Sequence, residues 1–322
     1  MTKSTAIAAA RVAITVVLVA ILVVIVWDRR GELLDLVEDP SWRLGAIFGL
    51  LVAGHFLNST EFWLLYRAQG VTQLGMLENW MVFTSGHLGN LLPGQVGSIY
   101  KFRYMKVVHG VGYAKSGSNY GANLVVTIVS SAVVGISGLT ISAAQGGDPS
   151  PVLFVVFGGL GLGALLLVAF PMPGLERLPG RVGNVWAGFR EGWEELRVQP
   201  RVATTTLGLD VGKYALDALR LQLAFSLVGI HESLPYFLVL APAAGMAGML
   251  AITPGGIGFL EGFVAAAAVG LGSELETGLL GATVDRGVTL AFSLVLGSVG
   301  WWWTLRGMRA VAARDLAVSE AG

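Results

Sequence analysis

The sequence contains no cysteine, only four histidines and few charged residues. Without cysteine the chain has no disulfide framework, no thiolate metal site and no cysteine nucleophile. Charged residues make up 13% of the chain, roughly half of the ~25% found in soluble globular domains. The histidines are scattered, and no HExxH motif or phosphate-binding glycine loop is present. These deficits exclude an ordinary soluble enzyme, and we expect neither a metal nor a cofactor.

Apolar residues and glycine are abundant. Hydrophobic residues account for 54% of the chain and glycine for 45 positions, and the mean hydropathy is +0.69. The apolar residues form continuous runs of about 20 residues, long enough to cross a hydrocarbon core about 30 Å thick. A membrane barrel would show short alternating segments instead. The sequence therefore predicts an all-α polytopic membrane protein.

Six of the apolar runs are interpreted as full transmembrane helices. They are residues 12–27, 44–66, 119–143, 152–170, 202–229 and 281–303. Two further stretches, 76–99 and 235–272, are interrupted. The breaks consist of Pro93, Gly94 and Gly97 in the first stretch and of Pro254, Gly255, Gly256 and Gly258 in the second. Because proline removes a helical donor and glycine relaxes the backbone, we expect two re-entrant helical hairpins.

The distribution of charge agrees with this topology. Six crossings place both chain ends on one side, together with most of the basic residues, whereas acidic residues such as Asp28, Glu32 and Asp35 gather on the other side. By the positive-inside rule the basic side is cytoplasmic. We therefore expect a multi-pass protein of the inner (cytoplasmic) membrane, with both termini in the cytoplasm.

Self-comparison at an offset of about 160 residues reveals an internal repeat. Pro93-Gly94-Gln95-Val96-Gly97 matches Pro254-Gly255-Gly256-Ile257-Gly258, and each half reads span, hairpin, span. The halves begin on opposite sides of the membrane, so the repeat is inverted, as in many transporters. The expected organisation is a first transmembrane helix with an external interfacial segment (1–42), a first half (43–143), a linking helix with a cytoplasmic amphipathic connection (144–201), a second half (202–304) and a cytoplasmic tail (305–322).

Charged residues inside the apolar segments are the candidate binding residues. Asp210, Lys213, Asp217 and Arg220 follow one another at spacings of three, four and three residues, which places them on one helical face. Such a stripe either contacts a polar head group or relays protons, or else it is a self-neutralised structural ladder. Further candidates are Glu261, just after the second break, and the pair Asp285 and Arg286 in the last span. For these the alternative is an ion pair between the hairpin and the last span.

The first half of the repeat contains further candidate binding residues, for which the sequence gives less support. Asn58 and Glu61 align with Asp217 and Arg220 in the repeat. Lys101 and Arg103 follow the first break, where they suit a lipid phosphate or serve only as topology determinants. His55 and His87 are interpreted as buried hydrogen-bonding residues rather than as proton carriers.

The two break motifs, with Glu261 and the later Asp285-Arg286, resemble the lysylphosphatidylglycerol synthase transmembrane-region family. The resemblance covers nearly the whole chain and implies a flippase-like membrane domain. Ser98 and Leu260 stand where the family pattern has an acidic and a basic residue. The resemblance therefore supports a head-group role for Glu261, Asp285 and Arg286 more than for the first half.

Our leading hypothesis is a lipid translocase. It would move the head group of a phospholipid, aminoacyl-lipid or lipid-linked sugar through a polar cavity between the inverted halves. The alternatives are a non-catalytic scaffold that presents a lipid to a separate transferase, and an ion-coupled carrier of a small solute. None of these is an enzyme. The expected partners are a membrane lipid, a separate transferase or a second copy of the chain, and not a nucleic acid.

Overall fold

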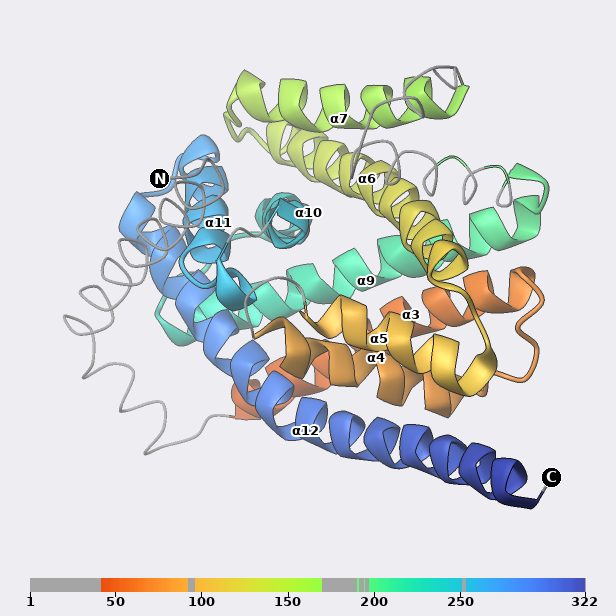
Figure 1. Cartoon of the computed structure of the whole chain (residues 1–322). Helices are drawn as coiled ribbons and strands as arrows, with labels where there is room; N and C mark the ends of the chain where they lie inside the picture. The colour runs from red at the N-terminus through yellow and green to blue at the C-terminus, as the bar shows by residue number, and fades with distance from the viewer. Residues whose placement is uncertain are drawn as a thin grey trace, which may run out of the picture. The chain divides into compact units, whose positions relative to one another are not determined.

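The computed structural model describes residues 42–91, 96–169, 190, 194, 197–250 and 253–321. Within these ranges the chain forms nine α-helices, one short 3-10 helix and no strand (Figure 1). The helices are α3 (Trp42–Ala68), α4 (Met76–Asn90), α5 (Val96–His109), α6 (Tyr113–Ala144), α7 (Pro151–Ala169), α9 (Pro200–Leu227), α10 (Leu234–Leu250), α11 (Phe259–Gly270) and α12 (Leu275–Ala321). The expected all-helical class is therefore confirmed. The span expected at 12–27 lies outside the described residues, as do Pro93 and Gly94 of the first break.

Two of the described helices are long and apolar enough to cross a membrane. They are α6, in which an 18-residue stretch has a mean hydropathy of 2.2, and residues Leu275–Arg314 of α12, in which such a stretch has a mean hydropathy of 1.5. Helices α7, α10 and α11 are apolar over shorter stretches. Helices α3 and α9 have 27 and 28 residues but contain charged residues. The fold is thus consistent with a helical membrane protein, and six crossings with an inverted repeat remain a prediction.

The surface of α7 also fits a lipid environment. This helix has 19 residues, none of them charged. Val152 is 65% exposed and Val155 is 72% exposed. Large contiguous apolar surface is uncommon on soluble monomers, because it would be in contact with water. Hydrocarbon chains around the helix remove that cost.

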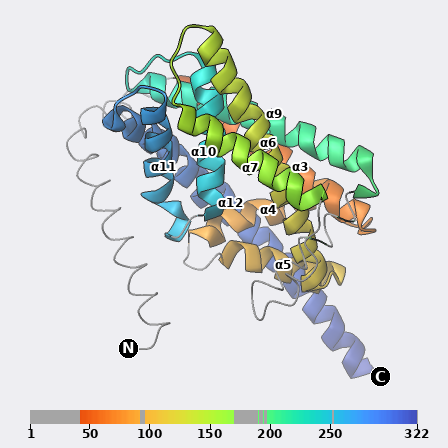
Figure 2. The same cartoon turned by 90° about the horizontal axis from the view of Figure 1, so that it is seen from above.

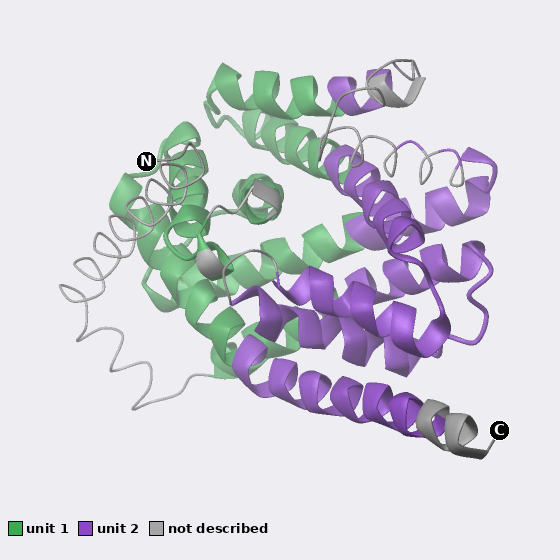
Figure 3. Cartoon of the chain, in the orientation of Figure 1, with its two compact units in different colours: residues 1–54, 130–161, 211–291 green, residues 55–129, 162–210, 292–322 purple. Residues whose placement is uncertain are grey.

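The described chain divides into two compact units (Figure 3). The first comprises the described residues up to 54 with 130–161 and 211–291, and the second comprises 55–129, the described part of 162–210 and residues from 292 onward. The core of the first unit is built around fully buried aromatic residues, Tyr214, Phe225 and Phe237. The second unit has smaller apolar clusters, one of which surrounds Tyr104.

Glycine allows close helix packing in the first unit. A Cβ atom at Gly135 of α6 would lie 2.6 Å from the ring of Phe157, so α7 approaches α6 directly there. Accordingly, α7 runs beside α6 in both views (Figures 1 and 2). At Gly138 a Cβ atom would lie 2.9 Å from the Pro235 carbonyl oxygen, at the start of α10. These contacts hold α6, α7 and α10 together.

In the second unit, α4 and α5 form an antiparallel hairpin. Gly86 faces Lys101, and Gly89 faces Gly97 so closely that a Cβ atom on Gly89 would lie 2.6 Å from the Gly97 Cα atom. The later residue of α4 faces the earlier residue of α5, so the two helices run antiparallel. We call α4 and α5 the first hairpin, and α10, the following turn and α11 the second hairpin.

Candidate functional site

The second hairpin turns through a run of glycines in left-handed conformations. Helix α10 ends at Leu250 and a 3-10 turn covers Pro254–Gly256. The φ angles of Gly255, Gly256 and Gly258 are +63°, +73° and +77°. L-residues with a side chain rarely adopt such values, whereas glycine does so without a steric penalty. The Thr253 hydroxyl closes the turn by donating to the Ile257 carbonyl oxygen at 2.9 Å.

Arg286 of α12 contacts this turn directly. Its guanidinium donates a hydrogen bond to the Gly255 carbonyl oxygen. Its Nε atom also lies 3.5 Å from Oε1 of Glu261, in the first turn of α11. Glu261 is buried, with a side-chain exposure of 1%. One arginine therefore connects the last helix to both the turn and the carboxylate that follows it.

Arg220 of α9 makes the second set of ion pairs. Its Nη2 atom lies 3.4 Å from Oδ1 of Asp217, one helical turn earlier. Its Nε atom lies 3.2 Å from Oδ1 of Asp285 on α12. A charged side chain placed among apolar helices is costly unless it is paired, and Arg220 is paired on both sides.

These five residues form what we call the charged cluster. It contains three carboxylates and two guanidinium groups, so its formal charge is one negative unit. Its N–O distances of 3.2, 3.4 and 3.5 Å exceed the roughly 2.7–2.9 Å of charge-assisted hydrogen bonds. The carboxylates therefore keep capacity to accept a donor from a bound molecule.

Two further candidates on α9, Lys213 and Asp210, also make polar contacts. Lys213 is in the first unit, where its Nζ atom is 3.9 Å from the centre of the Tyr214 ring. The carboxylate of Asp217 and the stem of Lys213 both pack near Gly54 of α3. Asp210 belongs to the second unit and is 1% exposed. The structure thus joins Asp217 and Arg220 of α9 to Asp285 of α12, which is followed by the hairpin contact Arg286.

The candidates of the first half all lie in the second unit. Glu61 is fully buried and accepts a hydrogen bond from Nδ2 of Asn123 at 2.7 Å. Asn58 is half-buried on the same helix, and Arg103 is exposed. Lys101 packs across Gly86, with its Nζ atom 4.1 Å from the centre of the Phe83 ring. Asn123 is a polar partner that the sequence pattern did not reveal.

His55 lies buried among aromatic rings. It is 6% exposed, and its Nε2 atom makes no hydrogen bond to any described residue. Its ring packs instead against aromatic neighbours, at centroid distances of 4.3 Å from His87 and 5.0 Å from Phe292. The expected burial of His55 is confirmed, and the structure surrounds its ring with aromatic neighbours rather than with a hydrogen-bond partner for Nε2.

A further polar contact was not expected from the sequence. Glu78, at the loop end of α4, accepts hydrogen bonds from the Tyr104 hydroxyl and from Nε2 of His109, both at 2.8 Å. Burial favours the neutral acid, but these hydrogen bonds outweigh it and leave the pKa of Glu78 below its ordinary value. Within the described ranges, no group of three or more histidine and acidic residues is arranged to hold a metal ion.

The apolar helices are consistent with a helical membrane protein, and the charged cluster lies buried among them. The family model for the transmembrane region of lysylphosphatidylglycerol synthase matches residues 9–297. The chain therefore belongs to the lysylphosphatidylglycerol synthase transmembrane-region family, as the break motifs predicted. This family describes the membrane part of such synthases and not a catalytic domain. Comparisons with curated proteins and with solved structures found no match.

Proposed function

We propose that this protein moves the polar head group of a lipid across the inner membrane while the tails stay in the bilayer. The head group would be that of a phospholipid, an aminoacyl-lipid or a lipid-linked sugar. The observation that carries the proposal is the charged cluster, which surrounds a broken hairpin within otherwise apolar helices. Ionisable residues inside membrane helices are costly and usually mark a transport path.

The chemistry of the cluster suits a head group that carries both donors and a charge. Carboxylates of Glu261 and Asp285 accept hydrogen bonds from hydroxyl or amine groups. Arg286 already donates to a backbone carbonyl at the turn, so a ligand that competes for this guanidinium would also release the turn. Binding of a ligand to Arg286 would in this way be coupled to movement of the second hairpin.

The proposed topology would supply the walls of the transport path. Six crossings and two re-entrant hairpins, related as inverted repeats, would form the walls of the polar path and place both termini in the cytoplasm. The order of elements supports the repeat, since a helix, a broken pair and a helix occur as α3 to α6 and again as α9 to α12. Alternating access in transporters commonly uses such repeats.

The direct test is lipid movement in reconstituted vesicles. The purified full chain is inserted into vesicles that contain a trace of fluorescent phospholipid, and an external reductant then bleaches the outer leaflet. We expect protein-dependent bleaching of lipid from the inner leaflet. Arg286→Gln and Glu261→Gln should slow this movement, whereas Arg309→Gln, a change at an exposed residue of α12, should not.

Unfolding temperatures measured in detergent separate lost transport from lost folding. A variant that folds as stably as the wild type but transports no lipid supports the proposal. If no candidate lipid moves in vesicles that contain well-folded wild-type protein, the proposal fails.

A scaffold is the second candidate function, and one observation favours it. Arg220 is neutralised from two sides by Asp217 and Asp285, as expected of a ladder that only holds helices together. A scaffold would present a lipid to a separate transferase. Stable co-purification with such an enzyme, without lipid movement by the purified protein, would establish this function instead.

A further inference from the structure

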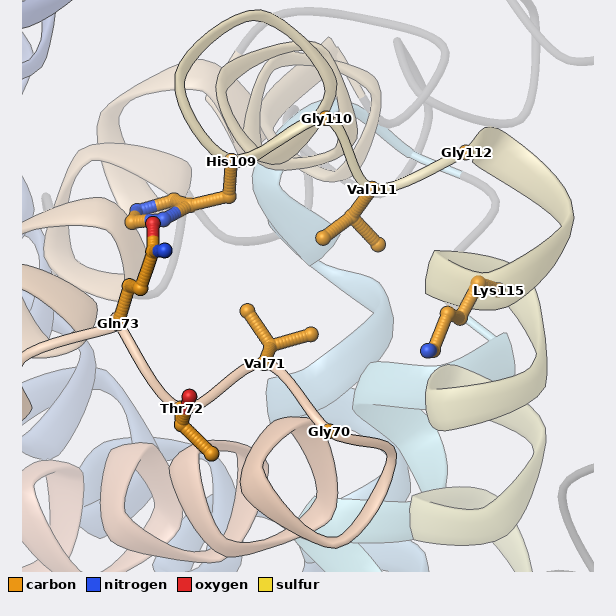
Figure 4. Close-up of a pocket in the computed structure, with 9 residues that line it drawn as sticks. All are labelled: Gly70, Val71, Thr72, Gln73, His109, Gly110, Val111, Gly112 and Lys115. Atoms are coloured by element: carbon orange, nitrogen blue, oxygen red, sulfur yellow. The ribbon is translucent and has the colours of Figure 1, made fainter.

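A small pocket opens in the second unit where four helices begin or end. Its walls are residues 70–73, between α3 and α4, and residues 109–112, between α5 and α6, together with Lys115 (Figure 4). Its volume is 290 Å³, at the lower end of the range of roughly 300–1,000 Å³ for ligand sites. We call it the loop pocket. Its size suits a compact polar group rather than a whole lipid.

The lining combines an apolar floor with polar groups on both sides. In Figure 4 the side chains of Val71 and Val111 point toward each other, Lys115 reaches in from α6, and His109 lies beside Gln73 on the opposite side. Lysine donates as a compact point charge, and the Thr72 hydroxyl and Gln73 amide add neutral donors. Donors of this kind match an oxyanion.

The positive charge of the pocket is not cancelled by a described carboxylate. Nζ of Lys115 donates to the Gln69 carbonyl oxygen at 2.5 Å, and Lys115 forms no ion pair with a described residue. Two more basic residues, Arg67 and Lys106, lie in the last turns of α3 and α5, just before the segments that line the pocket. Nζ of Lys106 lies 4.7 Å from the centre of the Tyr113 ring, and the Arg67 guanidinium lies 5.0 Å from that of Trp63.

Glu78 is the acidic residue bonded to a pocket residue. Its carboxylate is engaged by Tyr104 and His109, each at 2.8 Å. Lys115, Lys106 and Arg67 therefore add three positive charges against one carboxylate that is already bonded. The local potential is positive, and an anion entering the pocket gains from it.

We propose that the loop pocket binds a phosphate ester, with Lys115 as its charged contact and with Lys106 and Arg67 adding positive potential. Lysine is a common phosphate ligand. The ester is either the head group of an anionic phospholipid or a soluble phosphorylated molecule. The site goes beyond the proposed lipid transport, because it uses none of the charged cluster.

The test uses the full chain in nanodiscs of phosphatidylcholine, a lipid without net charge. Because the chain has no cysteine, one introduced cysteine can carry an environment-sensitive dye. Leu77, an exposed residue in the first turn of α4, follows the pocket residue Gln73 by four positions and does not line the pocket. One arm titrates glycerol 3-phosphate, and the other raises the fraction of phosphatidylglycerol in the nanodisc.

Two variants remove the site in different ways. Lys115→Gln removes the charge, and Gly112→Tyr fills the pocket at a position where a Cβ atom would meet nothing within 4 Å. We expect a saturable response whose affinity falls about ten-fold or more in Lys115→Gln, the usual effect of losing a charged hydrogen bond. Gly112→Tyr should lower the affinity to a similar extent by occupying space in the pocket. Arg309→Gln, the matched loss of one exposed basic residue, should leave the affinity unchanged.

The two arms identify the source of the phosphate. A response confined to phosphatidylglycerol supports a lipid head group, and a response confined to glycerol 3-phosphate supports a soluble ester. No response in either arm from protein with an intact unfolding transition overturns the proposal, as does equal weakening by Arg309→Gln. The assay measures binding without transport, so failure of lipid movement in vesicles would not alter its result.

Discussion

Arg220 and Asp285 meet at 3.2 Å although they belong to separate helices, α9 and α12. Arg220 also contacts Asp217 on its own helix, so one guanidinium serves two carboxylates. Within this set of three residues, Arg220 contacts two aspartates, whereas Asp217 and Asp285 each contact one arginine. Substitutions at the two ends of this arrangement should therefore differ in cost.

We expect Arg220→Gln to destabilise the protein far more than Asp217→Asn. The first change leaves two carboxylates without their cation, and loss of one member of a buried ion pair costs about 3–5 kcal/mol. The second leaves Arg220 paired with Asp285, and its partly exposed carboxylate should contribute less than about 1 kcal/mol. Unfolding of the purified variants in detergent measures both. Equal effects would show that Arg220 does not bridge the helices.

A close backbone approach in the first hairpin leads to a prediction about packing. Gly89→Ala would place a methyl group 2.6 Å from the Gly97 Cα atom, and backbone cannot move aside as a flexible side chain can. We expect a loss of about 1–3 kcal/mol, the usual cost of overpacking. Gly117→Ala on α6, where nothing lies within 4 Å, is the matched control. It should stabilise the protein by about 0.5–1 kcal/mol through helix propensity.

The absence of cysteine makes the topology directly testable. Single cysteines at Gln73 and Gly112 flank the first hairpin, and those at Glu232 and Glu274 flank the second. If both hairpins are re-entrant, each pair reacts with an impermeant thiol reagent from one side only. The first pair should react from the cytoplasm and the second from outside. Labelling of one pair from both sides would show that this hairpin crosses the membrane.

Glu78 predicts a pH dependence of stability. Its pKa in the folded protein is lowered by hydrogen bonds from His109 and Tyr104 that outweigh burial. A lowered pKa means that the carboxylate contributes its full stability above its unfolded pKa and loses it as the pH falls through the folded value. Wild type should therefore exceed Glu78→Gln in unfolding temperature at pH 7. The difference should shrink below about pH 4.5, near the unfolded pKa of a glutamate.

A variant control accompanies this measurement. Arg309→Gln should show the same pH profile as the wild type, because Arg309 is exposed and far in sequence from the loop. A difference between wild type and Glu78→Gln that stays constant down to pH 4 would mean that the carboxylate does not titrate with the hydrogen bonds described.

The helices could largely be predicted from the sequence, because apolar run length is a local property. The run 44–66 corresponds to α3 (Trp42–Ala68), and 202–229 corresponds to α9 (Pro200–Leu227). The proline and glycines of the second break likewise predict the interruption of the helix, and three of these glycines have positive φ angles in the structure. In each of these cases a few neighbouring residues determine the outcome.

The partners of the polar residues could not be predicted in the same way. Helical spacing places Asp217 beside Arg220, but it does not indicate that Asp285 approaches from α12. Glu61 accepts a hydrogen bond from Asn123, and Lys115 donates one to the Gln69 carbonyl oxygen. Both bonds depend on the packing of segments that are distant in the sequence. His55 shows the converse, since its polarity suggested a hydrogen bond, which the packing of the described residues does not supply to its Nε2 atom.

The left-handed glycine turn of the second hairpin restricts how this protein can acquire selectivity. A side chain at Gly255, Gly256 or Gly258 would be strained by the positive φ angles. At these three positions the turn therefore offers backbone groups rather than side chains to a bound molecule. If the protein moves head groups as proposed, selectivity among them would come from the side chains of the charged cluster around this turn.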